Sequence, residues 1–523
     1  MTSAETSKYA RFIRSEIDGV FDPVELIQLH VEAEVILLES ADVITKLGEK
    51  SILLLEPALR VEARNKKVFI EALEPEGEEL LPLLKKSLGS WLIESSKKTL
   101  TLGFSPLFNE FDVLEKMRMP SKLEVLRAVL KAIDVNEKDR AALMLSGIFS
   151  YDFIDHFENL SPARNDHINF PDYLFYLPLS GVVIEHPLQR CSIFSWTFED
   201  KNTQLRSQSR FKKLEHEVKN AVENHCAKKI FSSQIHCLDR NTFAVDVNDQ
   251  EFGKMIEQCK EYIDKGDVYQ IVPSRTFFRK VDNALLSYQA LRYLNPSPHM
   301  FYLSSREWTL LGASPETFIK VDQGGRRLFI RPIAGTRRRG LDSNGIVDPE
   351  LDMREQVSLC IDEKELSEHM MLVDLARNDI AGVSKPGTRR LRRLLAVDRF
   401  SHVMHLVSEV EGILKNDCDA LLAYQMSMNM GTLMGAPKVR AAELLRQIEN
   451  SKRGFYGGAI GYIDKNGDMD TAIIIRSALI KDEQAFVRAG CGVVYDSNID
   501  FETQETLNKA EAVLKALELA QRS

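Results

Sequence analysis

Cysteine is scarce in this chain, and its spacing excludes two common kinds of site. The 523 residues include only seven cysteines, and no two of them form a Cys-x-x-Cys pair. An odd number of scattered cysteines is not the pattern of a disulfide framework or of a zinc-binding module. We therefore expect free thiols and a cytoplasmic protein, because disulfides are rare in the reducing cytoplasm.

Long apolar runs and an excess of positive charge are also missing. The apolar run Tyr173–Ile184 is short and is interrupted by Pro178, so we expect no membrane-spanning segment. The first residues lack the charged and then apolar pattern of a signal peptide. The formal net charge of −9 argues against nucleic acid as a partner. A content of 44% apolar and 28% charged residues is typical of a soluble globular protein.

The chain is long enough for two domains, or for one large body with a lobe. Short β-type runs alternate with amphipathic helical runs, which predicts a mixed α and β fold. The charged segment Lys201–Lys229 contains few large apolar residues and indicates either a solvated helix or a linker. We place a boundary at its end, which gives an N-terminal lobe over 1–230 and a second region over 231–523.

A glycine-rich stretch, Gly431–Lys438, precedes a helical run. Gly431 and Gly435 permit backbone conformations that a β-carbon forbids, and Pro437 suits the first position of the helix. Two interpretations stay open: an ordinary turn, or a loop whose N–H groups and helix N-terminus bind an anion. It is not a nucleotide-binding P-loop, because two residues separate the second glycine from the lysine.

Two predicted helices each carry a pair of acids three residues apart. Glu365 and Glu368 lie in the mostly helical stretch Glu350–Arg377, and Glu502 and Glu505 lie near the start of the final helix. Residues three apart share one face of an α-helix. If the two acidic faces meet, their oxygens form a site that suits Mg²⁺ with several retained waters. The alternative is that both pairs lie on solvated helix faces.

Other ionisable residues lie in apolar surroundings. Arg476 lies within an apolar run that predicts one continuous strand, where a charge needs a structural ion pair or a substrate carboxylate. In the next strand, Gly490 and Gly492 allow backbone N–H groups to approach an anion. Glu316 follows an apolar strand, and His405 lies inside another, as either a core histidine or a catalyst. Together these features indicate a site for a small anion.

Motifs across the second half of the chain resemble those of the chorismate-utilising enzymes, and they occur in the order found in that family. The N-terminal Leu37–Ser40 extends the resemblance over nearly the whole chain. It implies an α+β fold in which two large, mostly antiparallel sheets pack face to face, with helices outside and a cleft between the lobes. The motifs are Pro332–Arg337, Glu365–Asp379, Gly431–Lys438, Tyr456–Tyr462 and Glu505–Lys509.

The resemblance also implies a site for chorismate. Mg²⁺ would hold the ring carboxylate and act as a Lewis acid. Glu316 would protonate the departing hydroxyl, His405 would assist the loss of pyruvate, and Arg476 with Tyr456 would bind the enolpyruvyl carboxylate. The matching positions are Glu316, Thr432 and His405 for catalysis; Gly335, Thr336, Tyr456, Arg476, Gly490, Gly492 and Lys509 for substrate; and Glu365, Glu368, Glu502 and Glu505 for Mg²⁺.

Two positions separate the branches of this family. Where the water-using members carry Lys, this chain has Gln270, which cannot serve as a base for water. Where the 4-aminating branch carries Lys, this chain has Ala334, which cannot be a nucleophile. Both positions favour the branch that converts chorismate and ammonia to anthranilate and pyruvate, the first step of tryptophan biosynthesis. The alternatives are a 2-amino-2-deoxyisochorismate synthase, an aminodeoxychorismate synthase component I, and a non-catalytic regulator that binds tryptophan or chorismate.

The ammonia source is not among these motifs. A glutaminase needs a cysteine nucleophile on a glycine-flanked turn, with a His and a Glu later in the chain. The only near match is Cys491 within Gly490–Gly492, and this stretch already belongs to the predicted substrate site. The resemblance implies a separate glutamine amidotransferase subunit, in a heterotetramer. It also implies a two-state feedback switch in which bound tryptophan keeps the cleft open, with His299 replacing a frequent Tyr. The matching tryptophan positions are Glu39, Ser40, Lys50, Pro298, His299, Met300, Ile460 and Tyr462.

Overall fold

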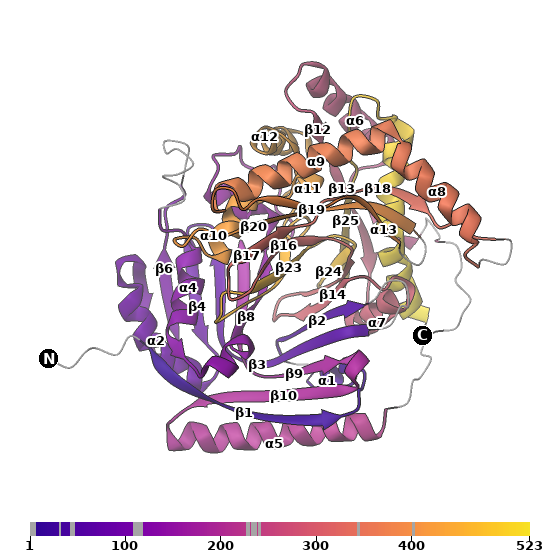
Figure 1. Cartoon of the computed structure of the whole chain (residues 1–523). Helices are drawn as coiled ribbons and strands as arrows, with labels where there is room; N and C mark the ends of the chain where they lie inside the picture. Colours follow the sequence, from indigo (N-terminus) through magenta and orange to yellow (C-terminus); the bar gives the residue numbers. More distant parts are fainter. Residues whose placement is uncertain are drawn as a thin grey trace.

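The computed structural model describes residues 7–30, 33–41, 48–107, 119–225, 242–342, 346–399 and 403–522, together with 231 and 238. Helices cover a large β-structure on several sides (Figure 1). The predicted α+β class is confirmed. No helix in these ranges is long and apolar enough to cross a membrane. The described cysteines Cys191, Cys259, Cys360, Cys418 and Cys491 are free thiols, as expected.

The strands that precede residue 230 are β1 (Lys8–Asp18), β2 (Val35–Ala41), β3 (Gly48–Arg64), β4 (Lys67–Ala72), β5 (Leu92–Ser95), β6 (Thr99–Gly103), β7 (Ile133–Asp134), β8 (Met144–Phe149), β9 (Tyr173–Glu185) and β10 (Arg190–Phe198). Those that follow are β11 (Ala244–Val245), β12 (Gln270–Ile271), β13 (Ser274–Lys280), β14 (His299–Ser304), β15 (Thr309–Ser314), β16 (Thr317–Asp322), β17 (Arg327–Ile330), β18 (Ile333–Arg338), β19 (Arg390–Arg399), β20 (Val403–Ile413), β21 (Gly435–Ala436), β22 (Ala459–Asp464), β23 (Met469–Ile473), β24 (Ser477–Lys481) and β25 (Gln484–Gly490).

Hydrogen bonds join these strands into one network, apart from the separate pair made by β12 and β21. Among the described strands, the pairings are antiparallel except that of β1 with β7. Two hydrophobic clusters lie against the network and contain most of the buried apolar side chains.

The helices are α1 (Pro23–Leu29), α2 (Pro75–Ser87), α4 (Leu123–Lys131), α5 (Lys201–Glu223), α6 (Asp249–Asp264), α7 (Ala284–Leu294), α8 (Pro349–Ile361), α9 (Glu363–Ala381), α10 (Ala420–Ser427), α11 (Gly431–Met434), α12 (Lys438–Ile448) and α13 (Ile499–Arg522). Short 3₁₀ segments cover 89–91, 137–142, 151–156 and 186–188. The charged α5 lies beside β10 and β1 at the bottom of Figure 1. It buries Phe211, Leu214 and Val218, so the helical interpretation of this segment is correct.

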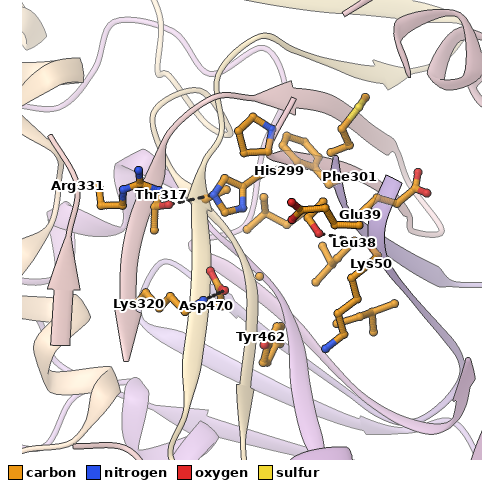
Figure 2. Close-up of a pocket in the computed structure, with 18 of the residues that line it drawn as sticks. Leu38, Glu39, Lys50, His299, Phe301, Thr317, Lys320, Arg331, Tyr462 and Asp470 are labelled. Carbon is orange, nitrogen blue, oxygen red and sulfur yellow. Dashed lines mark hydrogen bonds and ion pairs between the residues drawn. The ribbon is translucent and has the colours of Figure 1, made fainter. Parts of the chain in front are cut away.

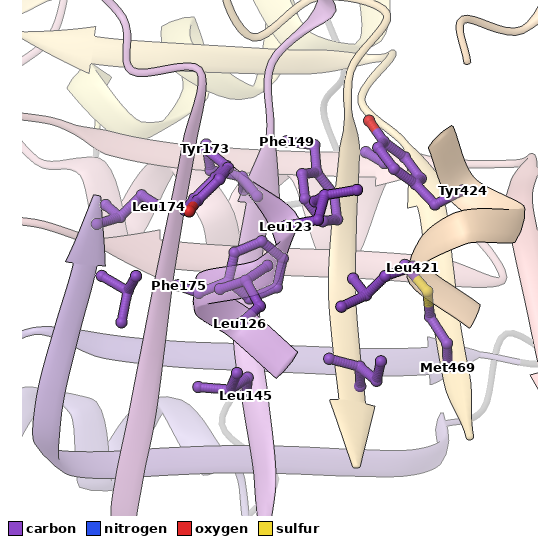
Figure 3. Close-up of a cluster of buried hydrophobic side chains, with 14 of the residues drawn as sticks. Leu123, Leu126, Leu145, Phe149, Tyr173, Leu174, Phe175, Leu421, Tyr424 and Met469 are labelled. Carbon is purple, nitrogen blue, oxygen red and sulfur yellow. The ribbon is translucent and has the colours of Figure 1, made fainter. Parts of the chain in front are cut away.

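Strands from both sides of the predicted boundary pair with one another. β2 pairs with β14, and β8 pairs with β22. An aromatic cluster makes the same connection, because Phe149 of β8 lies 4.7 Å from Phe175 and 4.1 Å from Tyr424 of α10, between ring centroids (Figure 3). The division into 1–230 and 231–523 stays a prediction, but the two regions share hydrogen bonds and a core.

Two elements are interrupted where the sequence predicted continuity. The stretch Glu350–Arg377 forms α8 and α9 instead of one helix, because Asp362 caps α9 by accepting from the N–H groups of Lys364 and Glu365, both at 3.1 Å. The apolar run around Arg476 is broken between β23 and β24, and Arg476 adopts a left-handed backbone conformation with φ of 51°. The expectation that Arg476 lies within a strand is therefore wrong.

Three charged side chains, Glu449, Arg453 and Arg488, are buried together. Glu449 accepts hydrogen bonds from Arg453 at 2.7 and 2.9 Å, and Arg488 lies 3.1 Å away. Arg453 also donates to the carbonyl oxygens of Val272 and Leu433, each at 2.6 Å. Through this ion network Glu449, the residue after α12, is joined to Arg488 of β25. Arg453 adds the links to Val272, which follows β12, and to Leu433 of α11.

The replacement Glu449→Gln leaves the two buried guanidinium groups without their counter-charge. We expect the free energy of unfolding to fall by about 3–5 kcal/mol, because an uncompensated buried charge is costly. The control Glu261→Gln removes an exposed ion pair with Lys265 at 3.7 Å. This control should change the free energy by less than about 1 kcal/mol. Denaturant titration measures both, and equal effects would contradict the assigned role of the network.

Candidate active site

A cavity of about 380 Å³ lies among β18, β20, α9, α11, β25 and α13. All the residues that the sequence analysis placed in the catalytic, substrate and metal groups line this cavity, although they come from distant parts of the chain. The structure thus brings the whole set together, while their individual roles stay predictions. The lining includes Gln270, Glu316, Gly335, Thr336, Glu365, Glu368, His405, Thr432, Tyr456, Arg476, Gly490, Gly492, Glu502, Glu505 and Lys509.

Glu316 is a buried acid at the junction between β15 and β16. Burial raises the pKa of Glu316 to about 8, against the opposing effects of a hydrogen bond from Thr432 and the charge of Lys509. The Thr432 hydroxyl lies 3.2 Å from Glu316 Oε1. At neutral pH this carboxyl is therefore protonated and able to donate a proton, which is the state that a general acid requires.

His405 lies on β20, opposite Thr336 of β18. Its Nδ1 lies 3.1 Å from the carbonyl oxygen of Gly335 and 3.0 Å from the hydroxyl of Thr336. A carbonyl oxygen only accepts, so Nδ1 carries the proton in this bond and Nε2 has the lone pair. Burial lowers the pKa of His405, which keeps the imidazole neutral. His405 is thus suited to accept a proton.

Arg476 and Tyr456 form the basic and phenolic part of the cavity. Among the described residues, no carboxylate lies within ion-pair distance of the Arg476 guanidinium, although Glu505 attracts it from further away. Burial lowers the pKa of Arg476, but a guanidinium starts from so high a value that it stays protonated in proteins. Burial raises the pKa of Tyr456, so its phenol keeps its proton at neutral pH. Two proton-bearing donors in a partly apolar cavity provide a suitable site for a carboxylate.

Two glycines let the backbone approach the cavity. A Cβ on Gly490 would lie 2.6 Å from the carbonyl oxygen of Pro273 and 3.1 Å from the Tyr456 hydroxyl. Gly335 has φ of 70°, and a Cβ there would lie 3.1 Å from Glu365 Oε2. Lys509 Nζ donates to the carbonyl oxygen of Gly490 at 3.1 Å. Any larger residue at Gly490 would therefore displace the groups that shape the site.

The two acid pairs line the same cavity, as the sequence suggested. Burial raises the pKa of Glu368, and the charges of Glu365 and Glu505 add to this effect. Burial also raises the pKa of Glu502. The pKa of Glu505 is lowered overall, because the charge of Lys509 and a hydrogen bond from Glu502 outweigh the effect of burial. Ser497 donates to Glu502 Oε1 at 2.8 Å.

The chemistry of these carboxylates fits Mg²⁺, but their spacing does not form a closed site. Within the described ranges, no three His, Cys, Asp or Glu side chains are arranged to hold a metal ion. Mg²⁺ commonly takes only one or two protein carboxylates and completes its shell with water and substrate oxygens. An ion held jointly by this protein and its substrate is compatible with such an open set.

The glycine-rich stretch contributes Thr432 and Leu433 to the cavity. Gly435 has φ of 122°, and a Cβ there would lie 2.2 Å from the carbonyl oxygen of Gln270. Pro437 precedes α12 as its cap and does not occupy the first helical position, so that expectation is wrong. Lys438 Nζ donates to Asp379 at 2.6 Å. Lys438 is thus engaged in a structural ion pair, and the stretch forms α11 and β21 instead of a plain turn.

Sequence reasoning missed Arg337, which also lines the cavity. Its guanidinium donates to Glu365 at 3.1 Å and to Asp362 at 2.6 Å, and so orients Glu365. Arg337 is the last residue of the first family-like motif, which could have identified it. Phe501 also lines the cavity and is largely exposed, but no pattern in the sequence singled it out.

A second cavity, of about 580 Å³, lies among β2, β3, β14, β16 and β22. Figure 2 shows Glu39, Lys50, His299 and Tyr462 around it. Glu39 accepts from Ser51 at 2.9 Å and from the hydroxyl of Tyr288. All the residues predicted for tryptophan line this cavity: Glu39, Ser40, Lys50, Pro298, His299, Met300, Ile460 and Tyr462. They form one site in space, although the bound ligand stays a prediction.

A family model described as "chorismate binding enzyme" matches residues 92–515. The chain therefore belongs to the family of chorismate binding enzymes, as the motifs predicted.

Individual proteins of this family are similar to the chain over nearly its whole length. Anthranilate synthase component 1 of Vibrio cholerae is 41% identical over 510 residues, which cover 97% of this chain and 96% of that protein. The protein of the same name from Escherichia coli is 41% identical over 490 residues, 93% of this chain and 92% of that one.

Solved structures share the fold. Anthranilate synthase component I of Streptococcus pneumoniae has a TM-score of 0.66 at 28% identity, over 89% of this chain and 92% of that one. The menaquinone-specific isochorismate synthase of Escherichia coli also has a TM-score of 0.66, over 98% of this chain and 95% of that one, but only 16% identity. The second likeness concerns the fold alone.

The raised pKa of Glu316 has a measurable effect on stability. The folded protein holds this proton more tightly than the unfolded chain does, so the contribution of Glu316 is lost as pH rises from about 4.5 towards about 8. The amide of Glu316→Gln does not titrate, so the variant does not lose stability in this way as pH rises. Relative to the parent protein, the variant should become more stable across that range, by on the order of a few kcal/mol at its upper end. Denaturant titrations at pH 5 and pH 8 measure the difference, and a difference that does not change with pH would contradict the assigned protonation.

Proposed function

We propose that this chain converts chorismate and ammonia to anthranilate, pyruvate and water, as the component I subunit of an anthranilate synthase. The observation that carries this proposal is the 380 Å³ cavity, whose lining includes a protonated acid, Glu316, a neutral imidazole, His405, and the guanidinium of Arg476. Identities of about 40% to proteins named anthranilate synthase component 1, over nearly the whole chain, support the same activity.

In the first step of the proposed reaction, ammonia adds to the ring carbon beside the carboxylate while the 4-hydroxyl departs. Glu316 gives its proton to the leaving oxygen, which becomes water. Thr432, at 3.2 Å, keeps the carboxyl oriented. Arg476 and Tyr456 bind the enolpyruvyl carboxylate and hold the ring in place.

In the second step, the aminated ring loses pyruvate and becomes aromatic. His405 removes the proton from the carbon that received nitrogen, as the carbon–oxygen bond to the enolpyruvyl group breaks. The enolate that leaves takes up one proton and becomes pyruvate, which balances the proton removed from the ring. The neutral imidazole, with its lone pair on Nε2, is the form needed for this transfer. A variant that released the aminated ring before this step would yield 2-amino-2-deoxyisochorismate instead.

We infer that Mg²⁺ is the cofactor and that Glu368 and Glu505 hold it, with Glu365 and Glu502 beside them. Bound there, the ion would neutralise the ring carboxylate as a Lewis acid. The joint placement of four carboxylates in one cavity supports this assignment.

Ammonia is the nucleophile that the cavity favours, and we propose that a separate glutamine amidotransferase subunit supplies it. Gln270 lines the cavity where a water-using enzyme needs a base, and an amide cannot take that role. The nearest match to a glutaminase nucleophile, Cys491, is buried, and burial raises its pKa, whereas a reactive cysteine needs a lowered one.

The catalytic assignment is tested with Glu505→Gln. Loss of this charge weakens both the metal site and the attraction on Arg476, so we expect kcat/KM for chorismate with ammonium to fall at least about 100-fold. Anthranilate fluorescence measures the rate at saturating Mg²⁺. The matched control is Glu511→Gln on the same helix, which removes only an ion pair with Lys515 at 2.8 Å. Unchanged turnover of Glu505→Gln would refute the metal assignment.

We further propose that tryptophan binds in the 580 Å³ cavity and inhibits the enzyme. A ligand with an indole ring and both charges suits a cavity lined by apolar Met300 and Ile460 and by charged Glu39 and Lys50.

The replacement Ser40→Phe fills part of this second cavity and should abolish tryptophan inhibition, while anthranilate formation stays within about 2-fold of the parent, because Ser40 does not line the catalytic cavity. Ser95→Phe, at an exposed position of β5, is the control. Inhibition curves distinguish the two, and normal inhibition of Ser40→Phe would place the tryptophan site elsewhere.

A further inference from the structure

The two cavities meet at a pair of consecutive residues. Glu316 lines the catalytic cavity, and Thr317, the first residue of β16, lines the second cavity. Neighbouring side chains in an extended backbone point to opposite sides. One peptide unit therefore carries the proposed general acid on one side and a hydroxyl of the ligand cavity on the other.

Thr317 is held by a residue from another strand. Its Oγ1 lies 3.0 Å from Nε2 of His299, the first residue of β14, and this hydrogen bond is drawn in Figure 2. Both side chains line the second cavity, so a ligand there can contact either partner. Burial lowers the pKa of His299, which keeps the imidazole neutral and able to donate or accept.

Glu316 is held through the same short segment. Its carbonyl oxygen accepts from the N–H of Ile473 at 3.0 Å, and its N–H donates to Ser314 Oγ at 3.3 Å. Thr317 pairs with Ala472 of β23, the residue before Ile473. These contacts hold Glu316 and Thr317 in one short segment, so the position of that segment sets the distance of Glu316 from Thr432.

We propose that Thr317 is a positioning residue for Glu316, and that its hydrogen bond with His299 transmits occupancy of the second cavity to the acid in the first. The inference rests on the proposed function, since it explains how tryptophan in one cavity reduces turnover in the other. Tryptophan that repositions His299 changes the bond to Thr317 and shifts the carboxyl away from the leaving oxygen.

The test is Thr317→Val, which keeps the shape of the side chain and removes the hydroxyl. We expect kcat to fall about 3- to 10-fold with KM for chorismate within about 2-fold, the effect of one lost hydrogen bond on a positioned acid. The tryptophan concentration for half inhibition should rise about 10-fold, while the dissociation constant of tryptophan, from calorimetry without chorismate, stays within about 2-fold. Tryptophan that still binds but inhibits less shows that the coupling between the two cavities is lost.

Three further variants make the result decisive. Thr317→Ser keeps the hydroxyl and should restore both kcat and inhibition, and Thr317→Ala removes the hydroxyl without adding bulk if valine disturbs folding. Thr197→Val is the matched control, because it removes a buried hydroxyl of β10 that has no hydrogen-bond partner.

The outcomes separate this inference from the proposed function. Tryptophan binding and inhibition that weaken by the same factor in Thr317→Val would overturn the inference and make Thr317 a simple ligand contact. Unchanged kcat and inhibition would overturn it as well. Absence of anthranilate with the unmodified protein would instead contradict the proposed function.

Discussion

The buried ion network of Glu449, Arg453 and Arg488 is the constraint on which the catalytic cavity depends. Arg453 donates to the carbonyl oxygens of Val272 and Leu433, so it fixes the chain beside Gln270 and Thr432 at once. Its guanidinium also lies 5.8 Å from the centre of the Tyr456 ring. Paired buried charges offer little net stability compared with apolar packing, but they require one geometry. The network therefore specifies how four distant segments meet around the substrate.

Burial sets the protonation states inside the cavity that this network shapes. It raises the pKa of Glu316 and lowers that of His405, so that an acid and a base are both neutral at the same pH. Glu505 keeps its charge because Lys509 stands beside it. One desolvated cavity thus holds a proton donor, a proton acceptor and an anion, which are the groups that amination followed by pyruvate loss requires. Its open carboxylate set leaves room for a cation shared with substrate.

The sequence predicted what depends on local pattern and on family-like motifs. Three-residue spacing placed Glu365 with Glu368, and Glu502 with Glu505, and these pairs do line one cavity. The break at Asp362 was not predicted, although its cap is a local contact with Lys364 and Glu365 that an Asp at this position can signal. The left-handed backbone at Arg476 interrupts an apolar run, and apolar pattern alone gives no sign of it. The same holds for the contact of His299 with Thr317, which arises from the pairing of β14 with β15 and the turn that follows. The residues of the second cavity were grouped only from the resemblance, since Glu39 reaches Met300 through the pairing of β2 with β14.

The most direct test of the account is the mass of the product formed by the purified chain from chorismate, Mg²⁺ and ammonium, without any partner subunit. Pyruvate loss in this cavity predicts anthranilate together with an equal amount of pyruvate. An aminated product that retains the pyruvyl group would contradict the assignment of His405 to the second step. A hydroxylated product in place of an aminated one would contradict the central claim that the cavity selects ammonia over water.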